Sequence, residues 1–433
     1  MKTVLRILIL ISALLVAEIP VAAQSAADLT RQGVVAYQAG DLVTAIAKLR
    51  EAQKLSPNDS NIRLYLGLML YQQDPQNLEA QELLESVADR VSENSEVQIK
   101  LLDSYLATGN KAKTDRQLSR LQPLVDRDEA LGFQVIYLLI RYGRSDDARE
   151  HIGKLGARIA PGTDAGPQAE TGRKDSRLGE LYFVRGILAA SENRKEDALK
   201  NLQLADRHEF PPRDSHHMVM LADSLYRIEE FRLAWQAYEE YLKHNPSDVE
   251  ARMRLGLSHY SLGVLEAAQA AFEQVRAADP LFPQVHYYLG EVFFLKNDLD
   301  GAEKSLQQEL RNDPKCGPCM AKLARVFYQK GDNEQAEEYL GRARQLSPDW
   351  PETHLVSGLL ANRKGRYEEA IKELEKVVEQ LPDFPTGHLQ LSIAYARAGQ
   401  AEKSRQHRET YNRLLEAQRH SVASGIRDER KPR

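Results

Sequence analysis

The feature that most constrains the fold of this chain is a 34-residue period in its second half. An alanine recurs with this period, and a proline follows each alanine after 12 residues; the pairs are Ala234 and Pro246, Ala268 and Pro280, Ala302 and Pro314, Ala336 and Pro348, and Ala370 and Pro382. Between these positions, apolar residues recur at the spacing of amphipathic helices, in two segments separated by a turn. The sequence therefore predicts an array of helix-turn-helix repeats, in which each repeat buries its apolar face against its neighbours.

Glycines occupy two fixed places in these repeats. One lies inside the first helix, at Gly33, Gly67, Gly186, Gly256, Gly290 and Gly358, and the other lies in the turn, at Gly40, Gly109, Gly143, Gly263, Gly331, Gly365 and Gly399. With these glycines, the following alanine and the closing proline, the chain resembles the tetratricopeptide repeat family. The resemblance implies an all-α, right-handed α-solenoid that binds other proteins. Eleven repeats are expected, beginning near residues 26, 60, 95, 129, 179, 215, 249, 283, 317, 351 and 385.

The N-terminus is typical of an export signal rather than of a repeat. Lys2 and Arg6 precede an apolar run, and Val21-Ala22-Ala23 offers the small residues that a signal peptidase recognises. We expect a signal peptide over residues 1–23 and an exported chain, periplasmic or secreted. An N-terminal lobe of about four repeats follows at 24–158, then a flexible linker at 159–178, which is rich in Gly, Pro and charge. The array at 179–420 has about seven repeats and a capping helix, and residues 421–433 are expected to be a disordered tail.

Composition argues against several classes of function. The formal net charge is -5 with no dense basic patch, which disfavours nucleic acid as a partner. The chain contains none of the patterns HExxH, GxSxG or the phosphate-binding loop, and no later apolar run is long enough to span a membrane. Three histidines share one first-helix position, His286, His354 and His388, but stacked helices would hold them too far apart for one ion. We expect no enzyme activity, no cofactor and no metal site.

One position of the first helix holds aromatic residues at 34-residue spacing, Tyr226, Tyr260, Phe294 and Tyr328. In the tetratricopeptide family the first helices line a concave groove, so the resemblance implies that these rings face it, together with Asp223, Arg227, Glu291 and Arg325. Two interpretations stand: ordinary packing between repeats, or a ladder that binds an extended peptide of another exported protein. An architectural subunit of an envelope complex is a further alternative.

The only two cysteines occur together as Cys316-Gly-Pro-Cys319. Cys316 occupies the position that holds Phe282, Trp350 and Phe384 in neighbouring repeats, where an apolar side chain packs onto the first turn of the next helix. Three interpretations remain open: a structural disulfide or packing pair, an exchange-active redox pair, and a metal half-site or inert thiols. A thiol–disulfide module is therefore the alternative to a binding scaffold.

Overall fold

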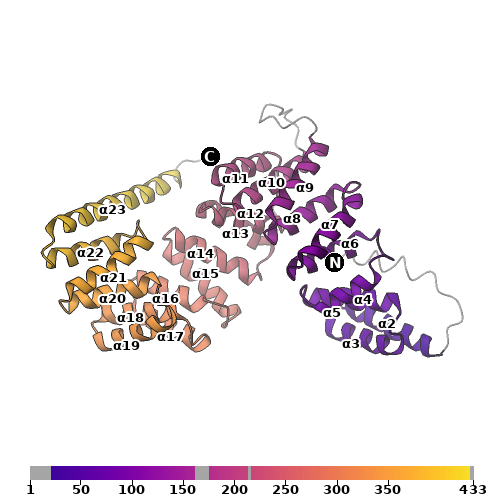
Figure 1. Cartoon of the computed structure of the whole chain (residues 1–433), viewed down its shortest axis with the longest axis horizontal. Helices are drawn as coiled ribbons and strands as arrows, with labels where there is room; N and C mark the ends of the chain where they lie inside the picture. The colour runs from indigo at the N-terminus through magenta and orange to yellow at the C-terminus, as the bar shows by residue number, and fades with distance from the viewer. Residues whose placement is uncertain (1–20, 161–174, 213–215, 430–433) are drawn as a thin grey trace. The chain divides into compact units, whose positions relative to one another are not determined.

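The computed structural model describes residues 21–160, 175–212 and 216–429. Every regular element in these ranges is a helix, and there are 22 of them (Figure 1). The chain divides into two compact parts, which we call the N-terminal part (Met1–Ile228) and the C-terminal part (Glu229–Arg433). The predicted all-α array of helix-turn-helix repeats is confirmed within each part.

The N-terminal part holds five helix pairs and one further helix, α12. Its helices are α2 (Val21–Gln38), α3 (Leu42–Leu55), α4 (Ser60–Gln73), α5 (Leu78–Val87), α6 (Ser95–Ala107), α7 (Lys111–Val125), α8 (Glu129–Arg141), α9 (Ser145–Ile159), α10 (Ser176–Ser191), α11 (Lys195–Arg207) and α12 (His217–Arg227).

The C-terminal part holds one helix, α13, followed by five helix pairs. Its helices are α13 (Phe231–His244), α14 (Val249–Ser261), α15 (Leu265–Ala278), α16 (Val285–Leu295), α17 (Leu299–Asn312), α18 (Gly317–Lys330), α19 (Asn333–Leu346), α20 (Pro351–Arg363), α21 (Tyr367–Gln380), α22 (Pro385–Arg397) and α23 (Ala401–Glu429).

Six first helices carry the predicted glycine, which is required because a large side chain of the second helix lies against it. A Cβ atom added to Gly290 would lie 2.7 Å from Leu306 Cγ, and one added to Gly256 would lie 2.5 Å from Phe272 Cε1. Real Cβ atoms do not approach other atoms so closely. Leu306 and Phe272 are fully buried by this contact, so the glycine sets how closely the two helices of a repeat pack.

The turn between the two helices requires a left-handed residue. All seven predicted turn glycines have a positive φ, between +67° and +85°. In three repeats that lack this glycine, the same position is occupied by Asn193, Glu229 and Asn297, with φ of 57°, 61° and 60°. Asparagine tolerates this conformation better than most residues, so two of the three substitutions follow a known preference.

The apolar core of the N-terminal part continues beyond the predicted lobe boundary. Leu155 of α9 shares one buried cluster with Leu181 and Leu188 of α10. Residues 161–174 of the predicted linker, and residues 1–20 of the predicted signal peptide, lie outside the described ranges. The linker, the lobe boundary and the signal peptide therefore stay predictions.

The C-terminal helix extends further than the sequence suggested. We expected a disordered tail from residue 421, whereas α23 continues to Glu429, and residues 430–433 lie outside the described ranges. No proline interrupts this segment before Pro432, so the backbone meets no strong helix breaker there.

Two histidines meet where α22 packs against this last helix. His388 Nδ1 lies 2.9 Å from His407 Nδ1, and His388 Nε2 lies 2.8 Å from the carbonyl oxygen of Pro382. Because a carbonyl only accepts, His388 donates from Nε2, and its Nδ1 accepts from His407. Burial lowers the pKa of His407, with a further lowering from His388 and Lys403 that Glu375 partly opposes.

We predict that Gly290→Ala will lower the free energy of unfolding by roughly 1–3 kcal/mol, because the new methyl group must displace Leu306. Gly341 in α19 is the matched control, since a Cβ there would have no neighbour within 4 Å. Gly341→Ala should stabilise the chain by roughly 0.5–1 kcal/mol through helix propensity alone. Urea unfolding followed by far-ultraviolet circular dichroism measures both, and equal effects of the two variants would contradict the packing role of Gly290.

We also predict that acid weakens the C-terminal end of the array. The folded-state pKa of His407 lies below the ordinary value of 6.5, so below pH 6.5 the unfolded chain binds more protons than the folded chain. The free energy of unfolding contributed by this residue is thus fully present above pH 6.5 and falls as the pH drops from 6.5 through the lowered pKa. Unfolding midpoints at pH 7.5 and 5.5 should differ less for His407→Gln than for the wild type. His244→Gln, at an exposed position, should leave the difference unchanged.

Candidate functional site

The structure places the eight predicted groove residues in both parts of the chain. In the N-terminal part, α12 carries Asp223, Tyr226 and Arg227; in the C-terminal part, α14 carries Tyr260, α16 carries Glu291 and Phe294, and α18 carries Arg325 and Tyr328. The candidate site is the group in the C-terminal part. It lies on consecutive first helices, where α16 packs against α18 and α18 against α20.

A buried lysine joins three of these first helices. The Lys322 Nζ of α18 lies 2.9 Å from Glu291 Oε1 of α16 and 3.2 Å from Glu352 Oε1 of α20. The three side chains are only 8–13% exposed, so water screens these charges weakly. Arg325, one turn after Lys322, completes the group with contacts of 3.0 and 3.2 Å to the two oxygens of Glu352. Two cations and two carboxylates thus form a network with no net charge.

Aromatic side chains of the predicted ladder belong to the same network. The Tyr260 hydroxyl donates a 3.0 Å hydrogen bond to Glu291 Oε2. Lys322 Nζ lies 5.0 Å, and Arg325 Cζ 4.9 Å, from the centre of the Phe294 ring, which is 7% exposed. The protein's own cations therefore occupy the surroundings of Phe294. This ring is poorly placed to stack with an incoming peptide.

The electrostatics of the network follow from its burial. Burial alone would raise the pKa of Glu352, but Lys322 and Arg325 outweigh it and hold that pKa below its ordinary value. Burial, followed by the Glu291 carboxylate, raises the pKa of Tyr260 and of Tyr287. The Glu352 carboxylate is thus held as an anion, and both tyrosines stay neutral at neutral pH.

Three residues of the site were missed by the sequence analysis: Lys322, Glu352 and Arg363. The Arg363 guanidinium of α20 lies 3.6 Å from the centre of the Tyr328 ring of α18, and it also donates a 2.6 Å hydrogen bond to Asn333. The sequence did contain a signal for the ion pairs: Glu291, Lys322 and Glu352 alternate in charge and are spaced about one repeat apart on first helices. Equivalent positions of adjacent repeats are neighbours, so such charges can pair.

The two cysteines lie at the start of α18, where Cys319 is one helical turn before Lys322. Cys316 is the N-cap residue, and its sulfur accepts a 3.2 Å hydrogen bond from the backbone N–H of Cys319. The structure joins the two sulfurs, with Cα atoms 5.3 Å apart. The geometry permits a disulfide, and its formation in the protein stays a prediction.

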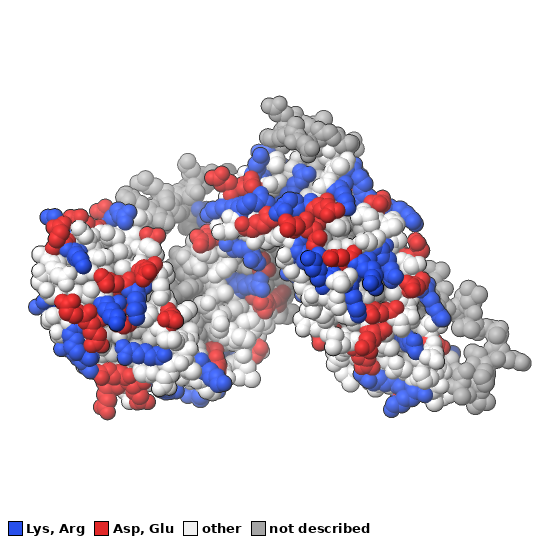
Figure 2. Space-filling view, viewed as in Figure 1, with Lys and Arg blue, Asp and Glu red and all other residues white. Residues whose placement is uncertain are grey.

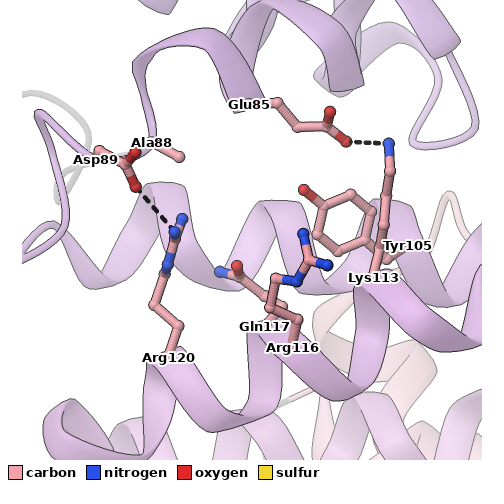
Figure 3. A pocket seen from close by; sticks show the side chains of 8 residues that line it. All are labelled: Glu85, Ala88, Asp89, Tyr105, Lys113, Arg116, Gln117 and Arg120. Atoms are coloured by element: carbon pink, nitrogen blue, oxygen red, sulfur yellow. Dashed lines mark hydrogen bonds and ion pairs between the residues drawn. The ribbon is translucent and has the colours of Figure 1, made fainter.

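A separate pocket of about 180 Å³ lies in the N-terminal part, between α5, α6 and α7 (Figure 3). Lys113 pairs with Glu85 at 2.6 Å and Arg120 pairs with Asp89 at 2.8 Å, with the Arg116 guanidinium between the two pairs. The pocket therefore has one more cation than anions. Because Arg116 and Arg120 are exposed, water screens this excess, and we assign no ligand to the pocket.

Basic and acidic side chains are intermixed over the visible face of each part, with no extended region of one sign (Figure 2). Among the described residues, no three His, Cys, Asp or Glu side chains are grouped closely enough to hold a metal ion. His354 instead contacts Glu373 at 2.7 Å, and His286 contacts the Pro280 carbonyl at 3.1 Å. None of the helices in the described ranges has the length and apolar character needed to cross a membrane.

Comparison with solved structures finds helical repeat proteins. A thermophilic TPR protein of Thermus thermophilus is 25% identical, and the match covers 42% of this chain and 98% of that one, with a TM-score of 0.36. The type IV pilus biogenesis factor PilW is 18% identical over 44% of this chain and 89% of its own, with a TM-score of 0.38. A chain of the APC/C hetero-tetramer Cut9–Hcn1 is 13% identical over 93% of this chain and 90% of that one, with a TM-score of 0.41.

No curated protein sequence matches the chain significantly. The family model described as "Tetratricopeptide repeat" matches four regions, residues 30–80, 219–268, 258–315 and 321–385. These regions contain the contacts of Gly256 and Gly290 and six of the ten left-handed turn residues described above, in both parts of the chain. The chain belongs to the tetratricopeptide repeat family.

Proposed function

We propose that this protein is an exported scaffold that binds an extended segment of another protein along the first helices of its C-terminal part. Membership of the tetratricopeptide repeat family supports the coarser function, a protein-binding scaffold. The finer proposal depends on the charge network of α16, α18 and α20, because it fixes the spacing of these helices and leaves their shared face without net charge.

The segment would lie on four residues near the C-terminal ends of consecutive first helices, Tyr260, Leu295, Tyr328 and Arg363, which we call the first-helix strip. Leu295 is 53% exposed although it is a large apolar residue, and Arg363 is also exposed. An apolar side chain and a stacked guanidinium beside half-buried tyrosines are typical of surfaces that bind polypeptide. The neutral network beneath them argues against a strongly charged ligand.

The spacing of the strip favours an extended segment. Neighbouring packed helices lie roughly 8–10 Å apart, and an extended chain rises about 3.3 Å per residue. About every third residue of the bound segment would therefore meet the next helix. A helical ligand rises only about 1.5 Å per residue and would match this spacing with fewer of its side chains.

We predict that Leu295→Asp weakens binding of the partner at least about tenfold, because a buried apolar contact is replaced by a desolvated carboxylate. The matched control is Leu281→Asp, which changes another exposed leucine, 72% exposed, in the connection between α15 and α16. The partner would first be captured with the full wild-type chain from the native extract. Its affinity for each purified variant would then be measured by isothermal titration calorimetry.

The two variants separate the outcomes of this experiment. Loss of binding by Leu295→Asp alone supports the first-helix strip. Full binding by both variants would place the site elsewhere on the chain, and equal weakening would show a general need for apolar surface. Circular dichroism of both variants checks that the helices remain folded.

Export is tested separately. We predict that the protein isolated from its native source begins at Gln24 or within a residue or two of it, because a signal peptidase would cut after Ala23. N-terminal sequencing measures this directly. A protein that retains Met1 would contradict the exported location. It would not affect the binding proposal, which the Leu295→Asp experiment tests.

A further inference from the structure

The sulfur atoms of Cys316 and Cys319 have very different surroundings. Cys319 is fully buried in the core shared by α16, α18 and α19, whereas Cys316 is only half-buried at the start of α18. Cys316 is therefore the more accessible of the two residues. Thiol–disulfide exchange needs one sulfur that can be attacked and one that is protected. A purely structural disulfide does not require this difference.

Packing accounts for the two residues between the cysteines, whereas helix capping does not account for Cys316. A Cβ on Gly317 would lie 2.1 Å from Ser347 Oγ, and Pro318 lies in the first turn, where proline is favoured. In contrast, α14 is capped by Asp248 and α4 by Asp59, which accept stronger hydrogen bonds than sulfur. Helix capping alone would thus be better served by aspartate than by Cys316.

The position of Cys316 stabilises a thiolate. Its sulfur faces the N-terminus of α18, accepts the N–H of Cys319 at 3.2 Å, and has no acidic residue in the first helical turn. The positive end of the helix dipole and this N–H both favour a negative sulfur. A stabilised thiolate is a better leaving group in exchange, and it favours the reduced form of the pair.

We propose that Cys316 and Cys319 form a thiol–disulfide exchange site that oxidises a dithiol of a partner protein. This function goes beyond the binding scaffold and uses none of the residues of the first-helix strip. It makes Cys316 the sulfur that the partner attacks and Cys319 the sulfur that is released first.

The exchange balances in two steps. A partner thiolate attacks Cys316 Sγ, the Cys316–Cys319 bond breaks, and Cys319 Sγ takes the electron pair and a proton. The second partner thiolate then attacks the partner sulfur of the mixed disulfide, and the electron pair of that bond stays on Cys316 Sγ. The products are a partner disulfide and a reduced Cys316–Cys319 pair, so two electrons and two protons have left the partner.

An apolar edge beside the pair favours a protein over a small thiol as partner. Leu346 lies against Gly317 and is 45% exposed, and Trp350, which ends the same loop, is 43% exposed. These side chains can contact the apolar residues that flank a cysteine in an unfolded segment. A small hydrophilic thiol would gain nothing from them.

The first test uses the full chain with its pair oxidised and a synthetic peptide that holds two cysteines among apolar residues. We expect stoichiometric oxidation of the peptide, observed by mass spectrometry. Cys319→Ser should form a stable mixed disulfide through Cys316 when given the oxidised peptide, and Cys316→Ser should form none because Cys319 is buried. Thiolate absorbance at 240 nm in Cys319→Ser should titrate well below the ordinary cysteine pKa of about 8.5.

Two results would overturn the proposal. One is a dithiol peptide that stays reduced in the presence of the oxidised chain, and the other is a Cys316 thiolate that titrates at or above about 8.5. The class of partner has its own test with Leu346→Ser combined with Trp350→Ser. That variant should react with the peptide about tenfold more slowly and with glutathione at the wild-type rate, as expected for loss of a binding contact. If this variant reacted with the peptide and with glutathione at the wild-type rates, a protein partner at this edge would be excluded.

Discussion

The contact between a glycine of the first helix and a large residue of the second is the constraint on which the rest of this structure depends. Gly256 against Phe272 and Gly290 against Leu306 leave no room for even a methyl group. In the repeats that carry this glycine, the two helices can therefore pack this closely only in the observed register, and these repeats offer their neighbours a similar surface. Regular stacking, and with it the alignment of equivalent side chains on successive first helices, follows from this contact.

The charge network of the C-terminal part depends on that alignment. Lys322 can meet carboxylates from the repeats before and after it only because α16, α18 and α20 present the same face in the same register. A buried ion pair is weak evidence of stability, since desolvation offsets much of the attraction. Its more certain effect is on specificity, because a shifted repeat would leave a charge buried without a partner. The network therefore selects one arrangement of the repeats and a neutral surface above it.

Much of this fold could be predicted from the sequence, because the repeat is marked by residues whose type is required by the backbone conformation. Gly331 and the other turn glycines adopt the left-handed conformation that few other residues tolerate. The site was only partly predictable. Tyr260 was found by its 34-residue spacing, and Glu291 as a groove residue that the family resemblance implies. Lys322 and Glu352 were not found, since their pairing depends on side chains that reach between repeats. The burial of Phe294 could not be predicted either. Its position on the helix indicates which way the side chain points, but not that Lys322 and Arg325 cover the ring.

The double attachment of Lys322 has a consequence for how the C-terminal part comes apart. Repeat arrays usually lose structure from their ends, one repeat at a time, because each repeat contacts only its neighbours. Fraying that reached α20 or α16 would strip one carboxylate from a lysine still enclosed by protein. That step would cost more free energy than the loss of an outer repeat, because it leaves a buried charge with one partner fewer. The Lys322 ammonium thus links α16, α18 and α20, so that local opening is confined to the outer repeats and the middle of the array stays rigid.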